Sequence, residues 1–170
     1  REYIYRAHGL IAKVSYLGVD TEKFRPLGLP KENLVVVAGE VHPRKGQDFV
    51  IRALAKIPIE RRPRLALVYT THNDYSQYIE KIAPKMGVTL ETHWLASDEE
   101  LVKVYNRSKL TLCAYRMEPF GLVPVESMAC GTPVICSNTT SLPEVVGDAA
   151  ILFNPLDLQE FKNTMDSVLL

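Results

Sequence analysis

The sequence contains few cysteines, and no two of them are closely spaced. Only three occur among the 170 residues, Cys113, Cys130 and Cys136, and none of them belongs to a C-x-x-C pattern. Each lies among apolar or small residues, and an odd number cannot all pair within one chain. We therefore expect reduced, buried thiols, as in a protein of the cytoplasm.

A long apolar run and an excess of charge of either sign are also missing. No run approaches the roughly 18 residues that a membrane-spanning helix requires. Twenty Lys and Arg residues balance twenty Asp and Glu residues, which argues against a nucleic-acid or anionic-membrane surface over the whole domain. With 46% apolar and 24% charged residues, the composition is that of one ordinary globular domain.

Side chains at metal-ligand spacing are lacking as well. The four histidines stand far apart in the sequence, and no D-x-D motif stands near the end of a predicted strand. No Ser–His–Asp or Cys–His set emerges from the chain order either. We therefore expect neither a metal nor a cofactor.

Six short apolar runs predict the strands of a sheet. They cover residues 34–38, 65–69, 88–94, 109–115, 133–136 and 149–153. Because most of these runs are apolar on both faces, they suit parallel strands that are covered by helices on both faces.

Helical signals lie between the predicted strands. Four segments carry them: 46–57, 75–86, 97–106 and 123–130. Pro84 is expected to kink or shorten the last turn of the second of these helices. The alternation predicts a doubly wound parallel sheet of about six strands with helices on both faces, in the α/β class. Ligands of such sheets bind in the loops at the carboxyl ends of the strands.

The first candidate site is the loop that follows the strand over 34–38. It ends in Lys45 and Gly46, directly before a predicted helix. Gly46 allows a close turn into that helix, and Lys45 places a positive charge over its N-terminus, where free N–H groups and the helix dipole favour phosphate. The same pattern suits a polar loop with a solvated lysine, and the residues alone leave both interpretations open.

The second candidate site follows the strand over 109–115. Glu118 lies in the loop and Glu126 in the first turn of the next helix, so both carboxylates face the ligand edge of the sheet. A carboxylate can accept hydrogen bonds from two adjacent ribose hydroxyls at once. Three backbone N–H groups point out of the helix N-terminus toward phosphate or sugar oxygens: those of Phe120, Gly121 and Leu122. Alternatively, Glu126 only complements the helix dipole and Glu118 is a surface residue.

The spacing of the two carboxylates resembles a known motif. Seven residues separate Glu118 from Glu126, as in the E-x7-E motif of retaining glycosyltransferases of the GT-B fold. The sequence of residues 118–135 resembles that of glycosyltransferase family 4, one of the group 1 families, and residues 141–148 match the same family. An isolated E-x7-E is weak, but its combination with the Lys–Gly loop and residues 141–148 is specific.

The resemblance also implies a domain organisation. Residues 18–26 resemble the hinge that leaves the N-terminal domain of these enzymes. Residues 1–12 would then be the end of that domain or a linker, and residues 13–170 the nucleotide-sugar (donor) binding domain, with its C-terminal tail truncated. The acceptor would bind the missing N-terminal domain, so we expect the isolated chain to be inactive in transfer. A cytoplasmic protein is implied, with peripheral association at the inner membrane face through the absent domain.

The resemblance assigns a role to each matching residue. Lys45 would hold the diphosphate and stabilise its charge as it leaves, Glu118 would contact the donor sugar, and Glu126 would hold the ribose hydroxyls. The backbone of residues 120–122 would serve the sugar and the distal phosphate, and Gly46 completes the turn. Residues 93–96 resemble the loop that frames the nucleobase, although a place for Trp94 in the core is equally compatible with the sequence.

One residue departs from the family pattern. The family usually has Arg directly after the glycine at position 39, where this sequence has Glu40. A carboxylate at that place would repel phosphate unless it turned away or paired with a cation. Arg44 is our candidate to supply the missing charge.

We therefore predict a retaining glycosyltransferase that transfers a sugar from a nucleoside diphosphate sugar to an acceptor, with this chain as the donor-binding domain. Two alternatives remain. One is a sugar-nucleotide epimerase of the same GT-B architecture. The other is a non-catalytic nucleotide-binding or scaffolding domain, in which Glu40 marks a lost diphosphate site.

Overall fold

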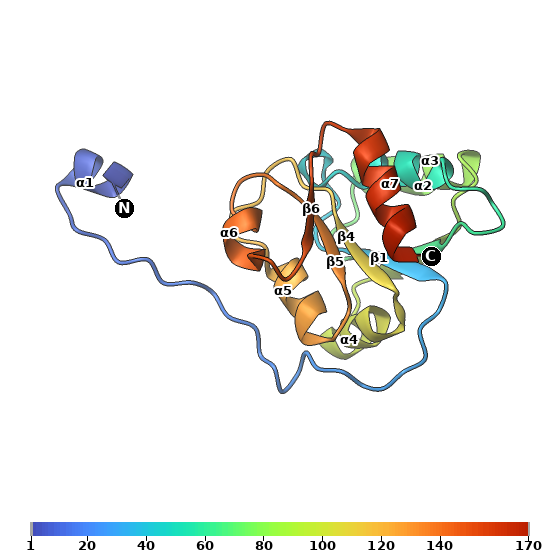
Figure 1. Ribbon diagram of the computed structural model, residues 1–170, viewed down its shortest axis with the longest axis horizontal. Coiled ribbons are helices and arrows are strands. Elements are labelled where there is room, and N and C mark those ends of the chain that lie inside the picture. Colours follow the sequence, from blue (N-terminus) through green and yellow to red (C-terminus); the bar gives the residue numbers. More distant parts are fainter. Residues whose placement is uncertain (1, 170) are drawn as a thin grey trace.

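The computed structural model describes residues 2–169, and the side chains of residues 4–169. Its centre is one sheet of six strands in the order β3-β2-β1-β4-β5-β6, of which β1, β4, β5 and β6 are labelled in Figure 1. Every neighbouring pair is parallel, which confirms the predicted doubly wound sheet. The strands are β1 (Leu34–Ala38), β2 (Arg64–Tyr69), β3 (Leu90–Trp94), β4 (Leu110–Cys113), β5 (Val134–Ser137) and β6 (Ile151–Phe153).

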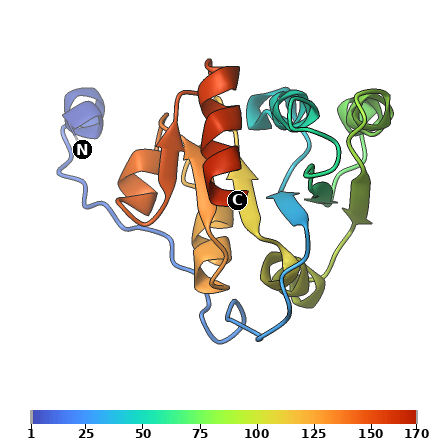
Figure 2. The ribbon, with the colours of Figure 1, turned by 45° about the vertical axis from the view of Figure 1, so that its right-hand side comes forward.

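Helices cover both faces of the sheet. One face carries α2 (Gln47–Ala55), α3 (Asp74–Lys85) and α7 (Leu158–Leu169), and the other carries α4 (Asp98–Arg107), α5 (Leu122–Ala129) and α6 (Leu142–Val146) (Figures 1 and 2). Pro84 lies in the last turn of α3, and the helix ends one residue beyond it. Ser97 caps α4, since its side chain accepts a hydrogen bond from the N–H of Glu100 at 3.2 Å.

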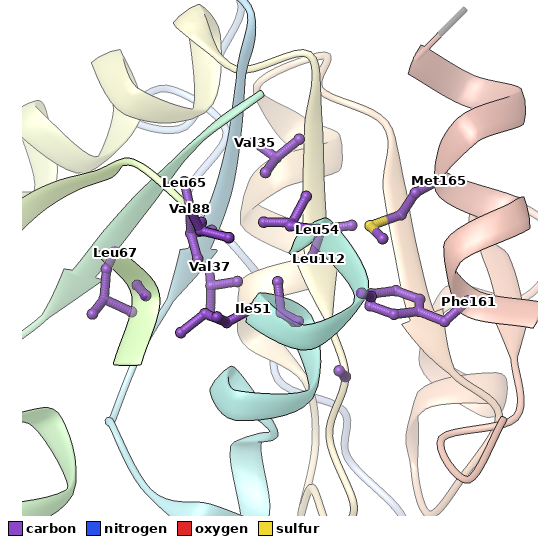
Figure 3. Close-up of a cluster of buried hydrophobic side chains, with 14 of the residues drawn as sticks. Val35, Val37, Ile51, Leu54, Leu65, Leu67, Val88, Leu112, Phe161 and Met165 are labelled. Atoms are coloured by element: carbon purple, nitrogen blue, oxygen red, sulfur yellow. The ribbon is translucent and has the colours of Figure 1, made fainter. Parts of the chain in front are cut away.

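The side chains of β1 show why the sheet is buried on both sides. Val35 and Val37 join the core under α2, α3 and α7 (Figure 3). The alternate residues, Leu34, Val36 and Ala38, pack toward α4. Because successive side chains of a strand point to opposite faces, an unbroken apolar run is what a doubly covered strand requires. The three cysteines are free and buried, as predicted.

A short helix, α1 (Glu2–His8), stands apart from the sheet at the end of an extended segment (Figure 1). The predicted domain limits run from residue 1 to residue 170, two positions that lie outside the described residues, and the boundary after residue 12 stays a prediction. No helix in the described part of the chain combines the length and hydrophobicity that crossing a membrane demands.

The strand order places a crevice between β1 and β4. The chain leaves β1 for α2 on one face, whereas it leaves β4 for α5 on the other face. Loops that diverge in this way open a gap at the carboxyl edge of the sheet, where ligands of such folds bind. Both candidate loops of the sequence begin at this point.

Candidate functional site

A glycine holds the two candidate loops together. Gly46 ends the short 3-10 helix η1 (Pro43–Lys45) with a φ of 69°. A Cβ at this position would lie 2.1 Å from the carbonyl oxygen of Ala114, so only glycine allows the two backbones to approach so closely. Next to this contact, the N–H of Arg116 donates to the carbonyl of Arg44 at 2.8 Å. The loop after β1 is thereby fixed against the loop after β4.

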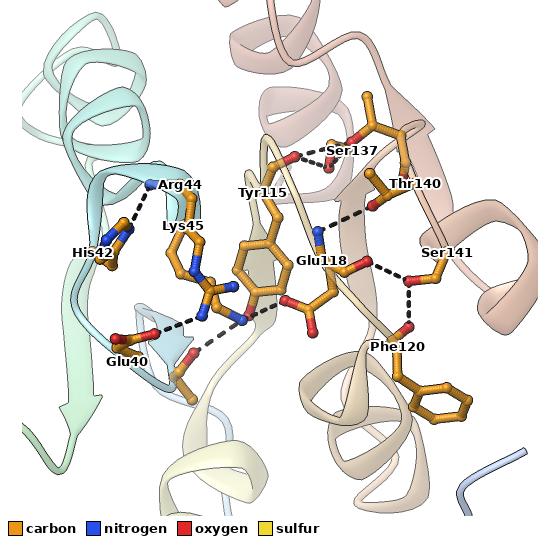
Figure 4. A network of polar contacts seen from close by, with 12 residues as sticks. Glu40, His42, Arg44, Lys45, Tyr115, Glu118, Phe120, Ser137, Thr140 and Ser141 are labelled. Carbon is orange, nitrogen blue, oxygen red and sulfur yellow. Dashed lines mark hydrogen bonds and ion pairs between the residues drawn. The ribbon is translucent and has the colours of Figure 1, made fainter.

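The two loops bring Lys45 and Glu118 into contact. The ammonium of Lys45 and the carboxylate of Glu118 form an ion pair (Figure 4), and only 8% of Lys45 is exposed. The same ammonium lies 4.0 Å from the centre of the Tyr115 ring, at a distance that suits a cation–π interaction. Lys45 therefore points into the site rather than into solvent, which excludes the interpretation as a solvated loop lysine.

A third loop fixes the backbone around Glu118. The hydroxyl of Thr140 accepts from the N–H of Glu118 at 3.1 Å. The hydroxyl of Ser141 lies 2.8 Å from the carbonyl oxygens of both Glu118 and Phe120 (Figure 4). Sequence reasoning assigned no role to Thr140 and Ser141. They follow β5, so the rule that ligand residues follow strands could have indicated them.

The N-terminus of α5 faces the same crevice. Gly121 precedes the helix with a φ of 108°, and a Cβ there would meet Cδ2 of Leu142 at 2.7 Å. Within the described residues, the N–H groups of Phe120 and Gly121 donate to no other group. Free N–H groups at the positive end of a helix dipole favour an anion.

Glu126 lies past the first turn of α5, because the helix begins at Leu122. The expectation of a first-turn position was therefore wrong, and with it the idea that Glu126 serves mainly to complement the helix dipole. The hydroxyl of Tyr105 donates to Oε2 of Glu126 at 3.0 Å. Burial raises the pKa of Glu126, and the hydrogen bond from Tyr105 opposes that shift. Tyr105 is a site residue that the sequence analysis missed.

Glu126 opens onto a pocket of about 200 Å³ at the carboxyl ends of β1 and β2. Its lining includes small and polar groups from the segments that follow β1, β2 and β3: Gly39, Thr70, Ala96 and Asp98. From Gly121 to Glu126 the helix rises by roughly 7.5 Å, at 1.5 Å per residue. The free N–H groups thus lie at one end of this segment and the carboxylate of Glu126 at the other.

Residues 19–170 match the family model described as glycosyl transferases group 1. The chain belongs to this family.

Group 1 relatives match over most of the chain. It is 34% identical over 154 residues to the serotype-specific mannosyltransferase WbdA of Escherichia coli, covering 87% of this chain and 18% of that protein. It is 33% identical over 159 residues to the MMP alpha-(1->4)-mannosyltransferase of Mycolicibacterium hassiacum, covering 90% of this chain and 38% of that protein. The chain thus spans well under half the length of these relatives.

Solved structures of glycosyltransferases share the fold. The sucrose-phosphate synthase of Thermosynechococcus elongatus superposes with a TM-score of 0.80 at 26% identity, over 99% of this chain and 46% of that chain. Anabaena Alr3699/HepE, solved in complex with UDP and glucose, superposes with a TM-score of 0.78 at 25% identity, over 91% and 46%. The sheet described above is therefore the Rossmann-like unit of the GT-B fold.

Glu40, the residue that departs from the family pattern, has a cationic partner nearby. Oε2 of Glu40 lies 2.6 Å from Nη2 of Arg44, in a partly exposed ion pair (Figure 4). The side-chain amide of Gln47 donates to the carbonyl of Glu40 at 2.9 Å and fixes the backbone there. Glu40 thus pairs with a cation, and the charge of Arg44 is directed at Glu40.

Two further predictions concern the base-framing loop and metals. Trp94 is 57% exposed, so its alternative place in the core is excluded, and its ring contacts the edge of His72 at 6.0 Å between centroids.

His93 lies between the carboxylates of Glu91 and Glu100, at 3.0 and 2.8 Å. Among the described residues, no three His, Cys, Asp or Glu side chains gather as a metal site would require; metal-free chemistry stays a prediction.

Proposed function

We propose that this chain is the C-terminal, donor-binding domain of a retaining glycosyltransferase of family 4, and that its ligand is a nucleoside diphosphate sugar. The observation that carries the proposal is the convergence of Lys45, Glu118 and the N-terminus of α5 at one edge of the sheet. A cation beside free N–H groups suits a diphosphate, and a nearby carboxylate suits sugar hydroxyls.

Each group has a defined role in the proposed reaction. Lys45 and the N–H groups of Phe120, Gly121 and Leu122 stabilise the negative charge that develops on the leaving diphosphate, as a preorganised electrostatic environment. Because Lys45 is almost fully buried, its charge acts through a low effective dielectric. Glu118 contacts the donor sugar, and no metal ion is required to neutralise the diphosphate.

Glu126 is proposed to bind the ribose. Its carboxylate opens onto the pocket that Gly39 and Ala96 also line. Ionised oxygens accept hydrogen bonds strongly, and two vicinal hydroxyls match one carboxylate. Tyr105 holds one oxygen in place, which fixes the orientation of the carboxylate and thereby the position of its other oxygen.

The names of relatives support a sugar nucleotide as ligand. Two relatives are named mannosyltransferases, and the Anabaena protein was solved with UDP-glucose. This chain covers only 46% of the Anabaena protein that was solved with UDP and glucose. We therefore propose that the acceptor binds a separate N-terminal domain of a longer polypeptide. The isolated chain would then bind donor without transferring sugar.

Two substitutions test these roles. Glu126→Ala should weaken the binding of UDP, GDP or ADP by about tenfold or more, because charge-assisted hydrogen bonds to the ribose are lost. Glu118→Ala should leave nucleotide affinity undiminished and reduce turnover in a protein that carries both domains. Comparable losses of nucleotide affinity in the two variants, measured by calorimetry, would show that the roles are wrongly assigned.

One observation favours a binding-only alternative. The Glu40–Arg44 pair places a carboxylate where the resemblance expects a cation for the diphosphate. A non-catalytic domain would bind nucleotide without turnover, and incubation of the two-domain protein with donor and acceptor distinguishes the cases. Release of nucleoside diphosphate that depends on Lys45 supports the transferase.

A further inference from the structure

We propose that Glu118 occupies the phosphate position on Lys45, and that a donor diphosphate binds by exchanging with this carboxylate. The inference rests on the proposed function and adds a control to the same site. It makes Glu118 a determinant of diphosphate affinity and specificity as well as a contact for the sugar.

The burial of the pair carries the argument. The side chains of Lys45 and Glu118 are 9% and 10% exposed. Among the described residues, Lys45 pairs with no other carboxylate and Glu118 with no other cation. Removing one partner from a buried pair leaves an uncompensated charge, which is strongly unfavourable. Lys45 therefore releases Glu118 only when another anion takes its place.

A phosphate can take that place without moving the loops. The ammonium of Lys45 sits over the Tyr115 ring, and the close backbone contact at Gly46 fixes its loop. The backbone of Glu118 is held by Thr140 and Ser141. Only the carboxylate arm is therefore free to swing, by rotation about its side-chain bonds.

The exchange links two events of donor binding. When a phosphate neutralises Lys45, the Glu118 carboxylate loses its partner at the same moment and turns toward hydroxyl groups, which are its best remaining donors. In a sugar nucleotide these hydroxyls are on the sugar that follows the distal phosphate. A ligand without a distal phosphate leaves the Lys45–Glu118 pair intact.

This arrangement predicts for which ligands the binding affinity depends on Glu118. A nucleoside monophosphate that is anchored by its ribose at Glu126 carries no second phosphate to reach Lys45. A nucleoside diphosphate does, and it competes with Glu118 for the same ammonium. Substituting Glu118→Gln, which preserves shape and removes the negative charge, therefore strengthens diphosphate binding selectively.

The test is a calorimetric titration of the wild-type chain and Glu118→Gln with UDP and UMP, GDP and GMP, and ADP and AMP. We expect the diphosphate affinity to rise by about tenfold, from the release of one charge-assisted contact, and the monophosphate affinity to change by less than about twofold. Wild-type protein that binds none of the six ligands refutes the proposed function. Wild-type protein that binds a diphosphate, with no gain in Glu118→Gln, refutes the exchange alone.

A second background separates exchange from general repulsion. In Lys45→Met, adding Glu118→Gln should give no further gain, because there is no pair to break. An equal gain in that background would mean that Glu118 acts only by repelling phosphates at a distance, and would overturn the proposal. Glu126→Gln is the matched control: it removes a carboxylate from the same crevice and should weaken monophosphates and diphosphates alike.

Glu118→Gln leaves the buried Lys45 without a partner, which lowers the stability of the fold. A second variant keeps the test valid if this protein unfolds below the titration temperature. Glu118→Asp keeps the charge but shortens the side chain by one methylene, which lengthens the contact to Lys45. We expect a smaller gain in diphosphate affinity of the same selectivity. A loss for diphosphates in this variant would contradict the exchange.

Discussion

Lys45 and Glu118 are 73 positions apart in the chain, yet their side chains form one buried ion pair. Each comes from a loop at the carboxyl end of a different strand, so the pair bridges the crevice between β1 and β4. A buried ion pair contributes little net stability, because desolvation offsets the attraction. Its position at the proposed diphosphate site therefore points to a role in ligand binding.

The contact that positions this pair can be tested at Gly46. Gly46→Ala introduces a Cβ that would lie 2.1 Å from a backbone oxygen, and the loop must move to relieve the clash. We expect the free energy of unfolding to fall by roughly 3–5 kcal/mol, and the binding of nucleoside diphosphates to be lost. Chemical denaturation and calorimetry measure the two effects.

Gly28 provides the control for Gly46. Its φ of 66° nearly equals the 69° of Gly46, but a Cβ at Gly28 would have no neighbour within 4 Å. Gly28→Ala should therefore cost only the backbone strain, about 1–2 kcal/mol. Equal losses in the two variants would show that the contact with Ala114 is unimportant.

The pH dependence of stability tests the environment of Glu126. Burial raises the pKa of this carboxyl above its ordinary 4.5, so the folded chain retains the proton more strongly than the unfolded chain. Stability from this group is thus present below pH 4.5 and is lost as the pH rises through the raised pKa. Thermal melts should show that Glu126→Gln escapes this loss.

The comparison with wild type gives the decisive sign. From acid to neutral pH, the melting temperature of Glu126→Gln should rise relative to that of the wild type, while its nucleotide affinity is reduced. A residue that is retained at a cost in stability is typical of a functional site. A relative fall in the melting temperature of the variant would contradict the burial argument.

Tyr105 is expected to position Glu126. Tyr105→Phe removes the donor to Oε2, which should cost about 1–3 kcal/mol of unfolding free energy and weaken nucleotide binding several-fold, by about three- to tenfold. Tyr75→Phe is the matched control, because it removes a half-buried hydroxyl that donates to Oδ1 of Asp48 at 2.9 Å and leaves Glu126 untouched. Equal effects of the two variants on nucleotide affinity would remove the positioning role.

Glu40 is expected to restrain Arg44. The pair is partly exposed, so Glu40→Gln should change the free energy of unfolding by less than about 1 kcal/mol. Freed from its partner, Arg44 gains the ability to reach a phosphate, and diphosphate affinity should rise by about two- to fivefold. Titration in low and high salt checks that the gain is electrostatic. Unchanged affinity would mean that Arg44 does not reach the ligand.

The strands and the two loops could be predicted because their signals are local. The unbroken apolar run over β1 and the glycine that ends η1 are sufficient to place Lys45 at the carboxyl edge of the sheet. The direction of the Lys45 side chain could not be predicted. It depends on how closely the loop after β1 approaches Ala114, which is a contact between distant segments.

The supporting residues were missed for a related reason. Tyr105 lies on the buried face of α4, where a sequence pattern cannot separate a core tyrosine from one whose hydroxyl holds a carboxylate. Thr140 and Ser141 hold Glu118 through hydroxyl groups, and such residues are common in any loop. Trp94 was open between core and surface, because a strand end can face either way.

A calorimetric titration of the wild-type chain with UDP, GDP and ADP tests the central claim most directly. The account predicts that at least one of them binds with a Kd below about 1 mM, and that Lys45→Met abolishes the advantage of that diphosphate over its monophosphate. The absence of binding for all three at millimolar concentration would contradict it.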